Sequence, residues 1–133
     1  MTEQKAAWLL TTLDGSQKLA TDRFGESVTA ARQNLGRHFA GILELGLSPT
    51  VRFEGGEKPA IYVGYSQELG NFHIVIMPDG SLYRHERVAK TSGGNNVFYD
   101  HGRELNEIEY MQNERRAYLR MAELVKTSLS AVT

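Results

Sequence analysis

The sequence contains no cysteine. Disulfide bonds, thiolate nucleophiles, and zinc or iron–sulfur sites built on cysteine are therefore excluded. Any catalytic chemistry would have to come from other side chains. A chain without cysteine is compatible with a reducing compartment, and we expect the protein to be cytoplasmic.

Long hydrophobic runs are also missing. A membrane-spanning helix needs about 20 consecutive apolar residues, and no stretch of the sequence approaches that length. The first residues, MTEQKAAWLLTTLDG, lack the basic end, the longer apolar block and the small-residue cleavage site of a secretory signal. We therefore expect no membrane partner and no signal peptide.

An excess of charge of either sign is absent as well. The 15 basic and 16 acidic side chains leave a formal net charge of −1. Nucleic acid attracts strongly basic proteins, so it is not an expected partner. Binding it would need a local basic patch, for which the candidates are Arg84, Arg87, Lys90 and the Arg115-Arg116 pair.

What remains is the composition of an ordinary globular domain. Hydrophobic residues make up 41% of the 133 positions and charged residues 23%, which argues against wholesale disorder. No internal repeat or linker divides the chain, so we expect one domain over residues 1–133. The periodicity divides it into a helical part at 1–47, an antiparallel sheet at 50–99 and a long helix at 102–131.

The first helix is predicted over residues 2–13. It ends at Asp14-Gly15, because glycine commonly follows the last residue of a helix. Residues 16–25 then form a polar connection. A strand over 8–13 is the competing interpretation.

The second helix is predicted over residues 27–45, where apolar side chains recur at three- and four-residue steps up to Gly46. Gly36 and Gly41 lie inside it, and each costs on the order of 1 kcal/mol relative to alanine. We attribute both glycines to the close approach of another element.

The period changes from 3.6 to 2 at residue 50. Strands are predicted at 50–54, 60–66, 71–77 and 81–88, with an optional fifth at 97–99 after a loop at 91–96. Short connections between successive strands indicate antiparallel neighbours. The predicted fold class is therefore α+β, with an antiparallel meander of four or five strands packed in two layers against the helices.

The C-terminal helix is predicted to carry an apolar stripe that includes Ile108, Met111, Tyr118 and Val125, with Arg115 inside it. Its 28 or so residues would span about 40 Å. A domain of this size has a radius of gyration of only about 14 Å, so the helix crosses the molecule or overhangs it. An overhanging apolar stripe predicts a homodimer through this helix, unless the helix kinks near Arg115.

The segment 72–88, FHIVIMPDGSLYRHERV, is the most informative part of the sequence. Pro78-Asp79-Gly80 has the residues of a turn that ends in a left-handed glycine. A three-residue loop with a bulge at the glycine would pair His73 with His85. A two-residue turn would instead place His85 opposite Ile74 and separate the imidazoles.

The paired register supports two functional hypotheses. We favour a non-enzymatic binding module that recognises a small molecule or a protein through the sheet face or the sheet–helix crevice. Its ligand-binding candidates are Tyr62, Tyr65, Tyr83, His85 and Arg87. The alternative is a small hydrolase or nuclease in which His73 and His85 act as an acid–base pair, with Arg87 binding an anion and Tyr83 positioning the substrate.

A zinc site needs three protein ligands of fixed geometry, and the sequence has no HExxH-type spacing, so we expect no metal and no cofactor. Tyr62 and Tyr65 flank Gly64, which marks a bulge or a close approach within a strand. Together with Trp8, these tyrosines are candidates for lining an apolar cavity between sheet and helices.

Overall fold

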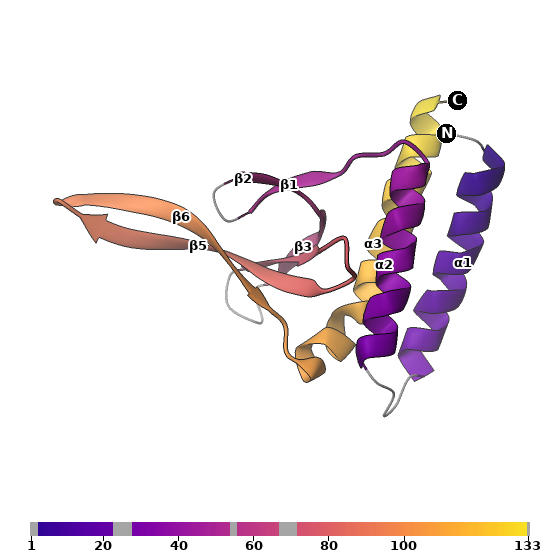
Figure 1. The fold of residues 1–133 in the computed structure, drawn as a ribbon, viewed down its shortest axis with the longest axis horizontal. Coiled ribbons are helices and arrows are strands. Elements are labelled where there is room, and N and C mark those ends of the chain that lie inside the picture. The colour runs from indigo at the N-terminus through magenta and orange to yellow at the C-terminus, as the bar shows by residue number, and fades with distance from the viewer. Residues whose placement is uncertain (1–2, 23–27, 54–55, 67–71, 133) are drawn as a thin grey trace.

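The computed structural model describes residues 3–22, 28–53, 56–66 and 72–132, and Figure 1 shows its fold. The elements in chain order are α1 (Glu3–Asp22), α2 (Val28–Glu44), β1 (Thr50–Phe53), β2 (Gly56–Pro59), β3 (Ile61–Ser66), β4 (Phe72–Ile76), β5 (Leu82–Ser92), β6 (Asn95–Glu104) and α3 (Glu107–Val132). Strands β3 to β6 form an antiparallel sheet in sequence order, and β1 pairs with β2 separately. The predicted α+β class with an antiparallel meander and a long C-terminal helix is confirmed.

The three helices lie side by side next to the sheet (Figure 1). Helix α3 packs along α1 and also contacts α2 and β3. The main core combines apolar side chains of all three helices with those of one sheet face, including Leu13, Leu35, Phe39, Ile42, Ile74, Ile76, Leu82, Tyr118, Met121 and Val125. We call this the inner face of the sheet, and the opposite one the outward face.

Helix α1 is longer than predicted. It runs through Asp14-Gly15 to Asp22, so the predicted connection is wrong over 16–22 and the alternative strand over 8–13 is wrong as well. Residues 23–25 of that connection lie outside the described residues. The reason is a tertiary contact, because buried Ser16 hydrogen-bonds His38 of α2 at 2.9 Å. That contact and the buried Leu13 outweigh the roughly 1 kcal/mol that Gly15 costs within a helix.

The glycines of α2 have the predicted role. A Cβ on Gly36 would lie 3.1 Å from the carbonyl oxygen of Asp79, and one on Gly41 would lie 3.3 Å from a methyl group of Leu9. Helix α2 therefore approaches the β4–β5 turn on one side and α1 on the other. Gly46, in the left-handed region with φ of +86°, follows the helix as predicted.

Strand β1 does not join the main sheet, contrary to the predicted meander. It pairs along its whole length with β2, from Thr50 opposite Pro59 to Phe53 opposite Gly56. This small hairpin lies against the outward face, where Val51, Ala60 and Val75 form a second buried cluster. The outward face is therefore partly covered at its Val75 end.

The predicted loop at 91–96 is wrong except at its turn, and the predicted edge strand at 97–99 is part of a longer edge strand, β6. Strands β5 and β6 pair from Tyr83 opposite Glu104 to Ser92 opposite Asn95. Gly93 and Gly94, with φ of +59° and +83°, form the two-residue turn. Because β4 pairs with β5 only as far as His85, the distal part of the hairpin projects from the body as a two-stranded arm (Figure 1).

Helix α3 begins at Glu107 rather than at residue 102, because β6 continues to Glu104. Asn106 caps the helix: its side chain accepts a hydrogen bond from the Glu109 amide at 2.9 Å, and the Glu109 carboxylate accepts one from the Asn106 amide at 3.1 Å. This reciprocal pair stabilises the first turn.

The buried side of α3 also differs from the predicted stripe. Ile108 and Met111 are exposed, whereas Tyr110, Ala117 and Met121 are buried. Because the helix packs along α1 of the same chain, much of its apolar surface is already covered. The homodimer through this helix stays a prediction.

Candidate functional site on the outward sheet face

The turn between β4 and β5 has the predicted three-residue geometry. The Met77 amide donates to the Ser81 carbonyl at 2.9 Å, and the Gly80 amide donates to the Met77 carbonyl at 2.9 Å. The Asp79 carboxylate accepts hydrogen bonds from the amide and the hydroxyl of Ser81. His73 therefore pairs with His85, and the alternative two-residue turn is wrong.

The helices hold this turn in place. Gly80 has φ of +86°, and a Cβ there would lie 1.8 Å from the Arg32 carbonyl oxygen of α2. The Tyr110 hydroxyl of α3 donates to the Gly80 carbonyl at 2.8 Å. Only glycine fits between the turn and α2, so the packing of the helices fixes the register of the two histidines.

Three rings meet on the outward face, and we call them the ring cluster: Tyr62 of β3, His73 of β4 and His85 of β5. The ring centroids lie 5.3 Å apart for Tyr62 and His73, 5.9 Å for Tyr62 and His85, and 6.2 Å for the two imidazoles. The Tyr62 hydroxyl lies 3.5 Å from Nδ1 of His85. These distances are those of favourable aromatic contacts.

The two imidazoles differ in exposure. His73 is exposed, while His85 is only 8% exposed. Partial burial, and then the nearby His85, lower the pKa of His73 from its ordinary value of 6.5. His73 is therefore mostly neutral at pH 7, and a neutral imidazole has one hydrogen-bond donor and one acceptor.

Tyr62 is positioned by contacts between β3 and α3. The register shifts between Tyr62 and Gly64, which is the predicted bulge. A Cβ on Gly64 would lie 3.0 Å from the guanidinium of Arg116. Nε of Arg120 donates to the Tyr62 carbonyl at 2.9 Å. The glycine thus lets α3 approach β3 and bring its arginines against the bulged strand.

The other predicted ligand-binding residues fall into two groups. Tyr83 lies on the outward face but packs, half-buried, against the Val51, Ala60 and Val75 cluster. Tyr65 pairs with His73 and Arg87 with Asp100 along the backbone, and the side chains of Tyr65 and Arg87 lie outside the described part. The structure therefore brings together Tyr62, His73 and His85, with Tyr83 beside them.

A metal site is not apparent at the cluster. In the part of the chain that the structure describes, no group of three or more histidine, aspartate or glutamate side chains is placed to hold an ion. Asp100 and Glu104 lie on β6.

The predicted cavity between sheet and helices is wrong in its membership. Tyr62 packs against the small cluster on the outward face. Trp8 instead lines a notch between α1 and α2 and is 69% exposed. The error came from placing Tyr62 and Trp8 on the same side of the sheet.

The basic residues also separate. Arg84 pairs with Ile74 on β4, so its side chain belongs to the inner face, opposite His85. Arg116 contacts Asn113 and the Gly64 bulge. The described arginines of β5 and α3 thus lie in different surroundings.

Among the helices of the described ranges, none combines the length and the apolar character that a membrane span needs.

Sequence reasoning missed a polar network buried between the three helices. Asn34 donates to the Ser16 Oγ at 3.0 Å and to the Tyr118 hydroxyl at 2.9 Å. Ser16 lies 2.9 Å from Nε2 of His38, and Tyr118 lies 3.4 Å from the Glu114 carboxylate. Burial, and then the Arg37 charge, lower the pKa of His38. The only signal in the sequence was Asn34 and His38, four residues apart on the buried side of α2.

The network joins all three helices. Ser16 accepts from Asn34, and its hydrogen bond with Nε2 of His38 runs in the direction that the imidazole tautomer sets. Ser16 is 7% exposed and His38 4% exposed, so we assign this network to the packing of the helices rather than to a reaction.

Comparisons with protein-family models, with curated proteins and with solved structures found no match to this chain.

Proposed function

We propose that the protein is a non-enzymatic recognition module that binds a protein partner through the outward face of the β3–β6 sheet. The observation that carries this proposal is the ring cluster of Tyr62, His73 and His85. Tyrosine is enriched among the residues that dominate binding energy in protein interfaces. Rings that already contact one another lose little side-chain freedom on binding.

The chemistry of the cluster favours a partner with polar and aromatic groups rather than strong charge. A lowered pKa keeps His73 mostly neutral at pH 7, so the cluster presents ring faces and hydrogen-bonding groups. A protein surface suits it better than a small molecule, because small-molecule sites are concave pockets that enclose most of the ligand. Recognition by this face needs one copy of the chain and does not depend on the predicted homodimer.

The hydrolase or nuclease is the second candidate, and the pairing of His73 with His85 favours it. A general acid and a general base must both reach the substrate. The low exposure of His85 argues against that, which is why we place binding first.

A peptide selection tests the binding module. Peptides retained from a random library by the wild-type protein would be titrated against His73→Ala and Tyr62→Phe, with Lys126→Ala on the exposed end of α3 as control. We expect His73→Ala to weaken binding by about tenfold or more and Lys126→Ala to leave it unchanged. Equal affinity for wild type and His73→Ala would contradict the proposal.

Activity assays on histidine variants test the hydrolase or nuclease. Wild type, His73→Ala and His85→Ala would be incubated with nitrophenyl esters and with short RNA. Turnover by the wild type that both single variants lose would replace the binding module with the acid–base mechanism.

A further inference from the structure

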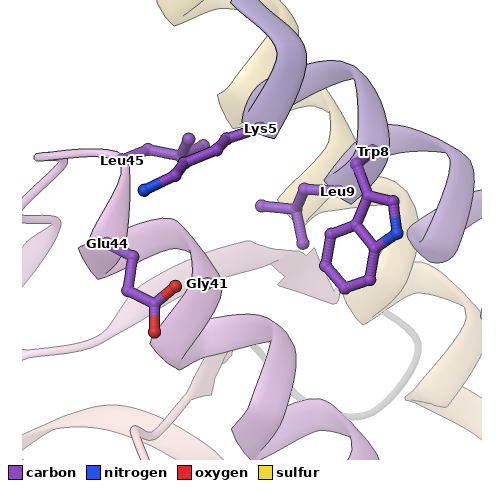
Figure 2. Close-up of a pocket in the computed structure, with 6 residues that line it drawn as sticks. All are labelled: Lys5, Trp8, Leu9, Gly41, Glu44 and Leu45. Carbon is purple, nitrogen blue, oxygen red and sulfur yellow. The ribbon is translucent and has the colours of Figure 1, made fainter. Parts of the chain in front are cut away.

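A second surface lies on the helical layer, away from the ring cluster. Helices α1 and α2 enclose a notch of about 240 Å³ lined by Lys5, Trp8, Leu9, Gly41, Glu44 and Leu45 (Figure 2). Leu9 and Leu45 are buried and form its apolar floor. Gly41 keeps it open, because any side chain there would press against Leu9.

Trp8 is the feature that needs an explanation. It is the only tryptophan of the chain, and it is 69% exposed beside the notch. Tryptophan is highly buried on average, and its ring contributes more apolar area than most side chains. A large exposed ring beside an apolar pocket indicates an interaction surface.

We propose that this notch is the contact surface between two copies of the chain, in which each copy places Trp8 in the notch of the other around a two-fold axis. A two-fold interface uses the same patch on both subunits and must be complementary to itself. This patch carries an exposed apolar ring next to an apolar pocket, so the ring of each copy can occupy the pocket of the other.

The charges on the rim meet the same requirement. Exposed Lys5 belongs to α1 and exposed Glu44 to α2, the two helices that flank the notch, and Figure 2 shows both side chains at the end of the notch away from Trp8. A two-fold axis that sets α1 of one copy against α2 of the other brings Lys5 to Glu44 of the partner subunit, and Glu44 to Lys5 of the partner subunit. A patch with charge of a single sign would instead repel its own copy.

The exposed apolar residues of α3 are the competing interface. Ile108, Met111 and Leu119 lie on that helix, but exposed Arg115 stands between Met111 and Leu119 on the same stripe. Antiparallel pairing of two such helices about their middle would place the two Arg115 side chains together. The α1–α2 notch has no such conflict, and its use does not depend on the proposed function of the sheet face.

The first experiment measures dimerisation and the fluorescence emission of Trp8. Sedimentation velocity gives the dimer dissociation constant, and Trp8 emission over the same concentration series reports whether the ring becomes buried. We expect dimerisation by about 100 μM, with the emission shifting to shorter wavelength as the dimer forms. We expect Trp8→Ala to weaken dimerisation by about tenfold or more and Leu119→Ser to leave the dimer affinity unchanged.

The second experiment separates contacts between copies from contacts within one. Lys5→Glu and Glu44→Lys each place like charges on both rims, so each alone should dimerise about tenfold more weakly. Mixed in equal amounts, they should form a heterodimer close to wild-type affinity, because each altered charge then faces its opposite. Each chain in that mixture still carries like charges on its own notch, so a contact within one chain cannot explain the recovery.

Three results would overturn the proposal. The first is a wild-type protein that stays monomeric at about 100 μM. The second is a Trp8→Ala variant that dimerises like the wild type, or a Leu119→Ser variant that loses the dimer while Trp8→Ala keeps it. The third is a mixture of the two charge variants that dimerises no better than either one alone.

Discussion

His38 and His73 are both held below their ordinary pKa of 6.5, mainly by burial. In the unfolded chain both titrate near 6.5, so as the pH falls the unfolded state takes up protons before the folded state does. The stability that neutral histidine contributes is therefore complete above pH 6.5 and is lost as the pH falls from there through the folded pKa values.

We therefore expect the free energy of unfolding, measured in urea, to be lower at about pH 5 than at about pH 7.5. His38→Gln together with His73→Gln should flatten most of this dependence. A wild-type profile that is flat across this range would contradict the expected burial of His38. The carboxyl of Asp79 titrates in a separate, more acidic range, since hydrogen bonds from Ser81 outweigh partial burial and lower its pKa.

Asn34 joins α1 and α3 to α2 through its two hydrogen bonds, to Ser16 and to Tyr118. Removing it breaks both hydrogen bonds, which together typically contribute about 1–3 kcal/mol. We expect Asn34→Ala to lower the free energy of unfolding by that amount. Gln33→Ala, at an exposed position of the same helix, is the control and should change it by less than about 0.5 kcal/mol. Equal effects of the two variants would show that the network contributes nothing.

At the scale of single residues, the candidate site was partly predictable from the sequence. The pairing of His73 with His85 followed from counting residues across Pro78-Asp79-Gly80, because turn chemistry is local. Gly64 was predicted as a bulge or a close approach, but the element that approaches it, Arg116 of α3, did not follow from the sequence. Contacts between residues about 50 positions apart leave no periodic signal in the sequence.

At the scale of elements, the β4–β5 turn depends on its contact with α2. Gly80 and Gly94 have nearly the same φ, +86° and +83°. A Cβ on Gly80 would collide with the Arg32 carbonyl, whereas one on Gly94 would meet nothing within 4 Å. The pair therefore separates the cost of left-handed backbone from the cost of the contact.

We expect Gly94→Ala to lower the free energy of unfolding by no more than about 1 kcal/mol, because the strain of the left-handed conformation can cost no more than the far end of the arm contributes. Gly80→Ala should lower it by at least about 2 kcal/mol more, because α2 and the turn must separate. Denaturant unfolding of both variants measures the difference. Equal losses would mean that the turn is not held against α2.

The elements show where sequence patterns fail. Helix α2 was predictable because its own periodicity and Gly46 define it. Helix α1 was predicted too short because its continuation past Gly15 depends on Ser16 meeting His38 of another helix. Residues 95–104 form a strand because β5 is available to pair with them over their full length, and the polar and charged residues there match either a loop or a helix start.

At the scale of the whole molecule, the fold consists of a body and an arm (Figure 1). The backbone ladder between β4 and β5 ends at His85, whereas that between β5 and β6 continues to Ser92 opposite Asn95. A two-stranded ribbon contributes little stability by itself. The body should therefore fold without the far end of the arm.

Removing residues 89–92 and 95–98 would join Val88 to Tyr99 through Gly93-Gly94 and keep the two-residue turn at an equivalent pair. We expect the shortened protein to unfold in one cooperative transition, with a free energy of unfolding within about 1 kcal/mol of the wild type. Loss of cooperative unfolding would show that the arm is part of the core structure.

The most direct test of the proposed function is the magnetic resonance of the two imidazoles. Carbon and proton signals of His73 and His85 would be recorded with and without a peptide selected by the wild-type protein. We expect both to shift on saturation and the pKa of His73 to change, because the peptide covers an exposed imidazole of the ring cluster. Shifts confined to residues of the helical layer, with both imidazole signals unchanged, would contradict recognition through the outward sheet face.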